Sequence, residues 1–281
     1  MKAIHIFALS FFVGTCFNTT TQAQAGSDFL TKEAPRDGVY DRYIYKEKLP
    51  LAYDFVHEKD VMWEKRVWRE IDTRVKQNHH FVAPQSNLAT VLLDAAKKGD
   101  ITAYSVWNDN FTQPLTCKQV QEICAQTDTV YTFNPTTFQE EMQIVVNVLD
   151  VNDIKKYRVK EVWFFDEETS KMNVRILGIA PIMDVYDNAG NFLHAGPMFW
   201  LYYPELRPIL AQTESFNELN DAMRMSWDDV FEARFFDSHI VKVSNVHDDR
   251  LQDKYSGIDI LLAADKVKQE IFNFEHDLWE Y

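Results

Sequence analysis

The chain has 281 residues, of which 46% are hydrophobic and 14% aromatic, and its formal net charge at pH 7 is −14. A composition this apolar excludes a disordered protein, because it can bury a core. The negative charge argues against a nucleic-acid partner, since it repels phosphate backbones. No stretch approaches the roughly 20 apolar residues of a membrane-spanning helix, so we expect no direct membrane insertion.

Residues 1–25 have the features of a secretory signal peptide. A positive charge and an almost wholly apolar stretch at residues 4–13 precede small residues that suit a signal peptidase. We predict cleavage after Ala23 or Ala25, which would place the mature protein outside the cytoplasm. Lipid attachment at Cys16 is the alternative, and it is disfavoured because the residue before this cysteine is not one of the small ones expected there.

Residues 26–60 are predicted to form an extended arm. Proline and glycine punctuate the segment, and its apolar residues have no helical period. Its aromatic side chains are Tyr40, Tyr43, Tyr45, Tyr53 and Phe55. Such a segment can become ordered by laying its aromatic rings on a partner, so we expect these residues to contact another subunit or protein. The alternative is an arm that packs on its own domain.

A helix is predicted for residues 61–75. The apolar residues that would share one helical face are Val61, Trp68, Ile71 and Val75. Glu64 interrupts this face, and Trp63 falls outside it. Trp63 is therefore a further candidate for a partner interface, because tryptophan is enriched at the centres of such interfaces.

A second helix is predicted for residues 88–98. Its apolar positions repeat with helical spacing, and they are Leu88, Val91, Leu92, Ala95 and Ala96. Gly99 suits the left-handed residue that ends many helices.

A third, short helix is predicted to follow Thr116, which can form a capping box with Gln119. We expect it to bury Cys117, Val120 and Cys124. On one straight helix the two cysteines lie about 10 Å apart, too far for a disulfide. A disulfide would therefore require a break in the helix.

The middle of the chain is predicted to be β structure. Residues 157–165, 172–187 and 192–203 are rich in aromatic and β-branched residues and are joined by short turns. Short connections require antiparallel neighbours, so these segments predict a three-stranded meander. Residues 142–151 are a candidate fourth strand of it.

Helices are predicted again towards the C-terminus. Ser226 and Asp229 fit a capping box before a buried stripe of Trp227, Val230, Phe231 and Phe235. A last helix is predicted near residues 261–279. The resulting fold is a single α+β domain over residues 61–281, in which an antiparallel β meander packs with flanking helices behind the N-terminal arm.

Residues that could carry chemistry are few. His79 and His80 have no accompanying ligands, and we expect no metal, no cofactor and no catalytic residue. The main alternative function is a periplasmic metal-dependent hydrolase that uses His247 and Asp248, although the other ligands of such a site are not recognisable. A second alternative is a carbohydrate or peptide binder that uses exposed tryptophans.

Long blocks of sequence resemble one known family. They are DVMW at 60–63, VWREID at 67–72, VWFFD at 162–166, VRILGIAP at 174–181, YYPELRP at 202–208 and WDDVFEARFF at 227–236. With these blocks in order over nearly the whole mature chain, the protein resembles the gliding-motility family GldN, called PorN in related bacteria.

The resemblance implies a non-enzymatic ring subunit of the type IX secretion system. It implies a location in the periplasm and a stable complex with an outer-membrane lipoprotein of the GldK/PorK type. It also implies self-association in a ring beneath the outer membrane and contact with a GldM/PorM-type inner-membrane motor protein. No catalytic residue is implied.

Overall fold

The computed structural model describes residues 39, 47–134, 139–186, 192–218, 220, 222–223 and 225–278. The chain divides into two compact units, residues 1–41 and 42–281, and every described helix and strand belongs to the second. Within the described residues, no helix combines the length and the apolar character that crossing a membrane would require.

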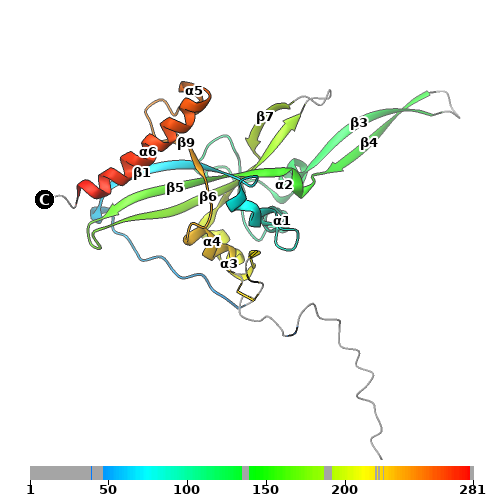
Figure 1. Cartoon of the computed structure of the whole chain (residues 1–281). Helices are drawn as coiled ribbons and strands as arrows, with labels where there is room; N and C mark the ends of the chain where they lie inside the picture. The colour runs from blue at the N-terminus through cyan, green and yellow to red at the C-terminus, as the bar shows by residue number, and fades with distance from the viewer. Residues whose placement is uncertain are drawn as a thin grey trace, which may run out of the picture. The chain divides into compact units, whose positions relative to one another are not determined.

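A mixed-length antiparallel sheet forms the centre of this unit (Figure 1). Its strands run in the order β2-β8-β6-β5-β1-β9, and β7 also pairs with β6. The strands are β1 (Val61–Asp72), β2 (Ala103–Tyr104), β5 (Ile154–Asp166), β6 (Lys171–Tyr186), β7 (Phe192–Pro197), β8 (Trp200–Tyr202) and β9 (His239–Val243). Helices accompany the sheet, so the predicted α+β class is confirmed.

The predicted meander is confirmed at β5, β6 and β7, and β6 pairs with neighbours on both sides. The predicted third strand is divided into β7 and β8. The candidate fourth strand was placed wrongly. Most of residues 142–151 belong to β4 (Gln139–Val148), which pairs with β3 (Ala125–Asn134) in a separate two-stranded sheet.

The predicted helix over residues 61–75 is wrong, because this segment forms β1. The strand pairs with β5 along its length and with β9 at residues 67–70. Its first six residues alternate between partly buried and exposed, as a strand requires. The helical stripe was misleading because Arg69 and Glu70, which a surface helix would leave in water, are buried between neighbouring strands.

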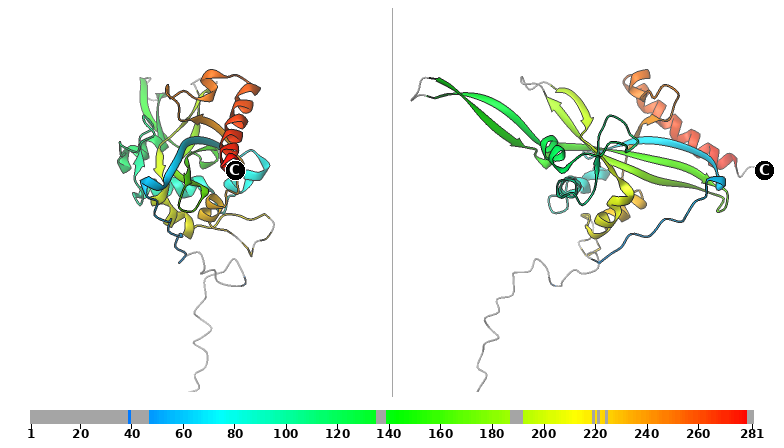
Figure 2. Two further views of the ribbon diagram at one scale, coloured as in Figure 1. Left: turned by 90° about the vertical axis from the view of Figure 1, so that its left-hand side faces the viewer. Right: turned by 180° about the vertical axis from the view of Figure 1, so that it is seen from behind.

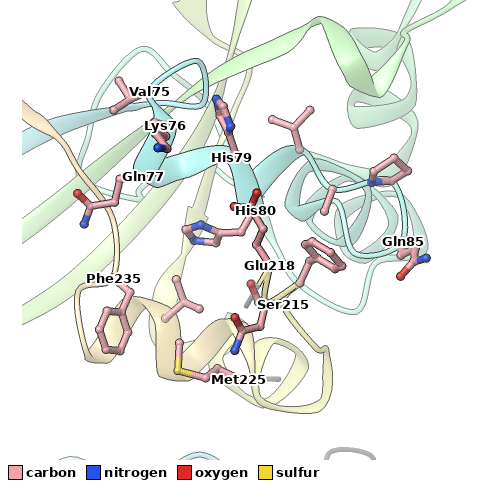
Figure 3. Close-up of a pocket in the computed structure, with 16 residues that line it drawn as sticks. Val75, Lys76, Gln77, His79, His80, Gln85, Ser215, Glu218, Met225 and Phe235 are labelled. Atoms are coloured by element: carbon pink, nitrogen blue, oxygen red, sulfur yellow. The ribbon is translucent and has the colours of Figure 1, made fainter. Parts of the chain in front are cut away.

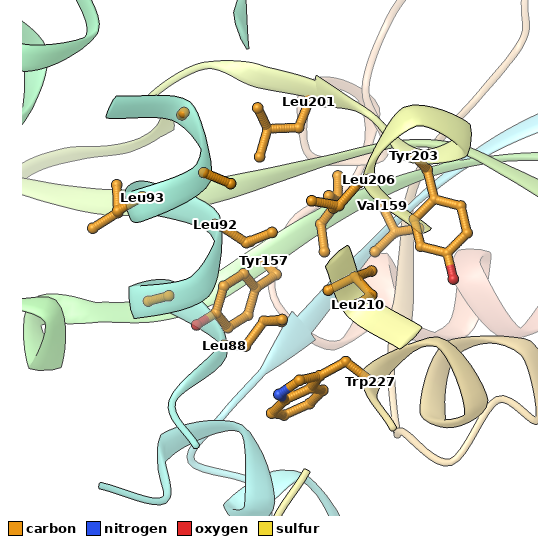
Figure 4. Close-up of a cluster of buried hydrophobic side chains, with 14 of the residues drawn as sticks. Leu88, Leu92, Leu93, Tyr157, Val159, Leu201, Tyr203, Leu206, Leu210 and Trp227 are labelled. Carbon is orange, nitrogen blue, oxygen red and sulfur yellow. The ribbon is translucent and has the colours of Figure 1, made fainter. Parts of the chain in front are cut away.

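The main core lies where the helices meet the sheet (Figure 4). Four α-helices contribute to it: α1 (Leu88–Lys98), α2 (Cys117–Cys124), α3 (Tyr203–Gln212) and α4 (Trp227–Glu232). Buried side chains that the figure labels include Leu88, Leu92, Tyr157, Val159, Leu206, Leu210 and Trp227. Helix α1 is confirmed, with Gly99 in the left-handed conformation at its end (φ 80°). Helix α3 was not predicted.

Helix α2 (Cys117–Cys124) begins at the predicted capping box between Thr116 and Gln119. Val120 and Cys124 are buried, as expected, but Cys117 is exposed because it occupies the first turn. Both thiols are free.

The capping box at the start of α4 is also confirmed. Phe235, however, is 52% exposed instead of buried, because the helix ends at Glu232 and Arg234 then takes a left-handed conformation (φ 56°). The helical period therefore does not continue to Phe235.

A second apolar cluster lies beneath α6 (Ile258–Asp277), which follows the short α5 (Leu251–Lys254). Helix α6 lies along the sheet at β1 and β9, as both views in Figure 2 show. Ala264 and Ile271 are buried there with Val67 of β1. The described residues also form three short 3-10 helices: η1 (Glu58–Asp60), η2 (Lys76–Val82) and η3 (Val151–Asp153).

Candidate functional site

A buried charge cluster joins β1 and β5 to the loop after α4. Glu161 is fully buried, and its carboxylate pairs with Arg69 at 3.2 Å and Arg234 at 2.9 Å. It also accepts a hydrogen bond from the Trp163 indole. Burial lowers the pKa of Arg69, and the negative charge of Glu161 opposes that effect. The cluster braces β1 and β5 against the loop after α4, and its Arg69 also lines a smaller pocket beside Ser238.

The hydrolase alternative gains no support from geometry. His247 and Asp248 are both exposed, and the Asp248 carboxylate pairs with Lys242 at 2.8 Å. Lys242 also pairs with Asp109 and lies over the Trp68 ring at 4.5 Å. Asp248 therefore helps to hold a buried lysine. The part of the chain that is described contains no group of three or more His, Cys, Asp or Glu side chains placed to bind a metal.

The described part of the arm lies against its own domain. Lys48 donates hydrogen bonds to the Ser226 hydroxyl at 3.1 Å and to Asp229 at the start of α4. Further along, the Arg207 guanidinium donates to the Leu51 carbonyl at 2.7 Å. These contacts fix the arm on α3 and α4.

Tyr53 is the central residue of this attachment. Its hydroxyl donates to Glu232, and its ring lies beneath the guanidinium of Arg207 at 4.1 Å and that of Arg175 at 5.0 Å. Burial raises the pKa of the Tyr53 hydroxyl, and the hydrogen bond to Glu232 adds to that effect. Arg207 is itself positioned by the buried Asp228 at 3.0 Å.

A large groove lies next to this attachment (Figure 3). Its volume is about 1180 Å3, and we call it the η2 groove. In Figure 3, η2 and the following loop form one side, and the segments around Ser215, Met225 and Phe235 form the other. The apolar residues that line it are Val75, Val82, Ala83, Pro84, Phe216, Met225, Val230 and Phe235.

His80 lines the groove, and its side chain is partly buried. Its ring is stacked on Trp227 at 5.8 Å, and burial lowers its pKa, which favours the neutral imidazole. Its Nε2 is buried and has no hydrogen-bond partner among the residues that the structure describes. The adjacent His79 is exposed and also lines the groove.

The residues predicted for a partner interface have different environments. Tyr40, Tyr43 and Tyr45 lie outside the described residues, so their contact with a partner stays a prediction. Tyr53 is engaged within the chain, whereas Phe55 is 79% exposed. Trp63 is partly buried and stacks on Phe274 of α6 at 4.6 Å.

One exposed aromatic residue was missed by sequence reasoning. Trp107 is 87% exposed in the loop after β2. The same loop is fastened by a hydrogen bond from Asn108 to Thr112 and by the contacts of Asp109 with Lys160 and Lys242. The run of polar turn-forming residues at 108–110 is the sequence signal that could have placed this tryptophan on a surface loop.

The fold and these surfaces define an α+β domain with a groove and an attached extended segment, both suited to protein contacts. The family model described as "Gliding motility associated protein GldN" matches residues 56–280, and the chain belongs to this family. The resemblance seen in the sequence is thereby confirmed. The family is a gliding-motility component linked to type IX secretion and is not a known enzyme family. No curated protein matches the chain.

Proposed function

We propose that this chain is a non-enzymatic periplasmic ring subunit of the type IX secretion and gliding machinery. It would bind a GldK/PorK-type outer-membrane lipoprotein and contact a GldM/PorM-type inner-membrane motor protein. The observation that carries the proposal is the family match over residues 56–280, which takes in every described helix and strand. The protein would act by linking partners on the two membranes.

Two exposed aromatic residues support contact with partners. Trp107 is presented by a loop whose neighbouring residue Asp109 is tied to the sheet, so binding requires less ordering of the loop backbone. Phe55 is the exposed aromatic residue of the described arm. Aromatic anchors of this kind contribute most of the binding energy at many interfaces. We propose both for the contact with the lipoprotein.

Binding to the purified lipoprotein tests this directly. Trp107→Ala should weaken the complex by about tenfold or more, as expected for an interface anchor. The matched control is Phe272→Ala, which removes an exposed aromatic residue from α6 instead. A wild-type chain that does not bind the lipoprotein would contradict the proposed function. Equal affinities for the two variants would contradict only the role of Trp107.

The periplasmic location has a separate test. Export should remove the first 23 or 25 residues, so mass spectrometry of the mature protein should find Gln24 or Gly26 at its start. The protein should fractionate with the periplasm and, through its partner, with the outer membrane. A lipid-modified N-terminus at Cys16 would contradict this prediction.

A further inference from the structure

Helix α6 carries apolar side chains on two different sides. On the side that faces the sheet, Ala264 and Ile271 are buried in one cluster with Val67 of β1. On the side that faces solvent, four large apolar side chains are more than half exposed, namely Ile258, Leu261, Leu262 and Phe272. Covering such surface is favourable, by roughly 25 cal/mol for each Å2 removed from water. The second side of α6 therefore has the composition of a contact surface.

The residues of this exposed side have the spacing with which two helices pack on each other. Successive members are three, four, three and four positions apart, and they are Ile258, Leu261, Asp265, Lys268 and Phe272. All five are exposed. This alternation keeps side chains in one narrow stripe along a helix, as in coiled coils. We call the stripe the α6 seam, and its length is about 21 Å.

The α6 seam is presented by a helix that is fixed to the sheet. Lys65 of β1 pairs with Glu270 of α6 at 3.5 Å, and Figure 2 shows α6 lying along the sheet. Leu261, Asp265 and Lys268 also line the small pocket beside Ser238, so the seam borders the sheet. Because the helix is already in place, little backbone order has to be gained when a partner packs on it.

The seam is complementary to itself when two copies of α6 run antiparallel. If Asp265 of each chain faces Lys268 of the other, Leu261 of each chain faces Phe272 of the other, because both pairs of positions share one midpoint. In a parallel arrangement each charge would face its own kind, and like charges repel. Polar residues within an apolar seam commonly set the register of paired helices in this way.

We propose that α6 of a second copy of this chain packs antiparallel on the α6 seam and forms a two-fold dimer. The occupant is a second copy because the seam matches itself in both its charges and its apolar ends, as an isologous contact requires. The seam is short, so the dimer is weak, with a Kd in the micromolar range. This inference goes beyond the proposed ring function and needs only this chain.

Sedimentation equilibrium of the full mature chain tests the proposal at about 1–200 µM, a range that brackets a micromolar Kd. The wild-type chain should change from monomer to dimer across it. Lys268→Asp places like charges at the middle of the seam and should raise the Kd by about tenfold or more. The matched control is Lys266→Asp, which makes the same change of charge at an exposed position about 200° around the helix. It should change the Kd by less than about twofold.

A double exchange tests the antiparallel register. Asp265→Lys alone should weaken the dimer as Lys268→Asp does. Combining the two changes exchanges the charges and restores two attractive pairs, so the Kd should return to within about threefold of the wild-type value. Thermal unfolding of each variant separates loss of the dimer from loss of the fold.

Three results would overturn the proposal. One is a chain that stays monomeric over the whole range. Another is a dimer that Lys266→Asp and Lys268→Asp weaken equally, and the third is a double exchange that leaves the dimer weakened. All these measurements use this chain alone, so their failure would leave the lipoprotein complex untouched.

Discussion

Two clusters in this molecule use the same chemistry in different surroundings. In the sheet, Glu161 pairs with Arg234, whose guanidinium lies over Trp163 at 5.3 Å. At the arm, Glu232 accepts a hydrogen bond from Tyr53, whose ring lies beneath a guanidinium. Glu161 is fully buried, whereas the side chain of Glu232 is 36% exposed. This difference in solvent exposure should determine how much each charged contact contributes to the free energy of unfolding.

The energetic consequence follows from desolvation. Removing one member of a buried ion pair leaves the other charge without water or partner, which is strongly destabilising. At a half-exposed site, water replaces the lost partner and salt screens the charge. The cluster around Glu161 should therefore stabilise the whole fold. The cluster around Glu232 and Tyr53 should stabilise only the attachment of the arm.

The largest effect is expected from Glu161→Gln. This change leaves Arg69 and Arg234 near an uncharged amide and should lower the free energy of unfolding by about 3–5 kcal/mol. Urea unfolding measures it. The matched control is Glu64→Gln on the neighbouring strand β1, where the pair with Arg66 is exposed and the change should stay within about 0.5 kcal/mol. Similar values for both would remove the distinction between the clusters.

A smaller effect is expected from Tyr53→Ala. Losing the ring beneath Arg207 and the hydrogen bond to Glu232 should cost about 1–2 kcal/mol locally, because both contacts are partly solvated. Hydrogen exchange should rise at residues 48–56 and stay unchanged in β5. Phe55→Ala is the control, since its exposed ring supports no described contact with Arg207. Loss of protection throughout the sheet would show that the arm is part of the core.

The smallest effect on the free energy of unfolding is expected from His80, whose pKa is lowered by burial and not by a charged partner. Burial lowers its pKa in the folded chain below the roughly 6.5 of an unfolded histidine. The unfolded state then binds the proton more readily, so His80 should reduce stability as pH falls below about 6.5, by at most about 1.4 kcal/mol per pH unit. Urea unfolding at pH 7.5 and 5.5 should show a smaller decrease for His80→Gln. An identical decrease would exclude this contribution.

Sequence reasoning succeeded where the determinants are local. The capping boxes at Thr116 and Ser226 and the stop at Gly99 depend on residues within a few positions of one another. The strand character of β6 followed from its β-branched and aromatic residues. The meander then followed from short turns.

The sequence-based predictions failed where the structure depends on contacts between residues that are distant in sequence. The segment that forms β1 has an ambiguous pattern, and its partners β5 and β9 lie far along the chain. The attachment of Tyr53 depends on Arg207 and Glu232, which no local pattern brings near the arm. The η2 groove is likewise built from two segments that are distant in sequence, so neither segment alone predicts it.

We propose above all that this chain assembles with a lipoprotein into a ring. The most direct test is co-expression of the mature chain with the GldK/PorK-type lipoprotein, followed by light scattering and electron microscopy of the purified complex. We expect a closed assembly containing many copies of both chains. A complex that stays a simple pair of one chain with one lipoprotein, or two proteins that elute separately, would contradict it.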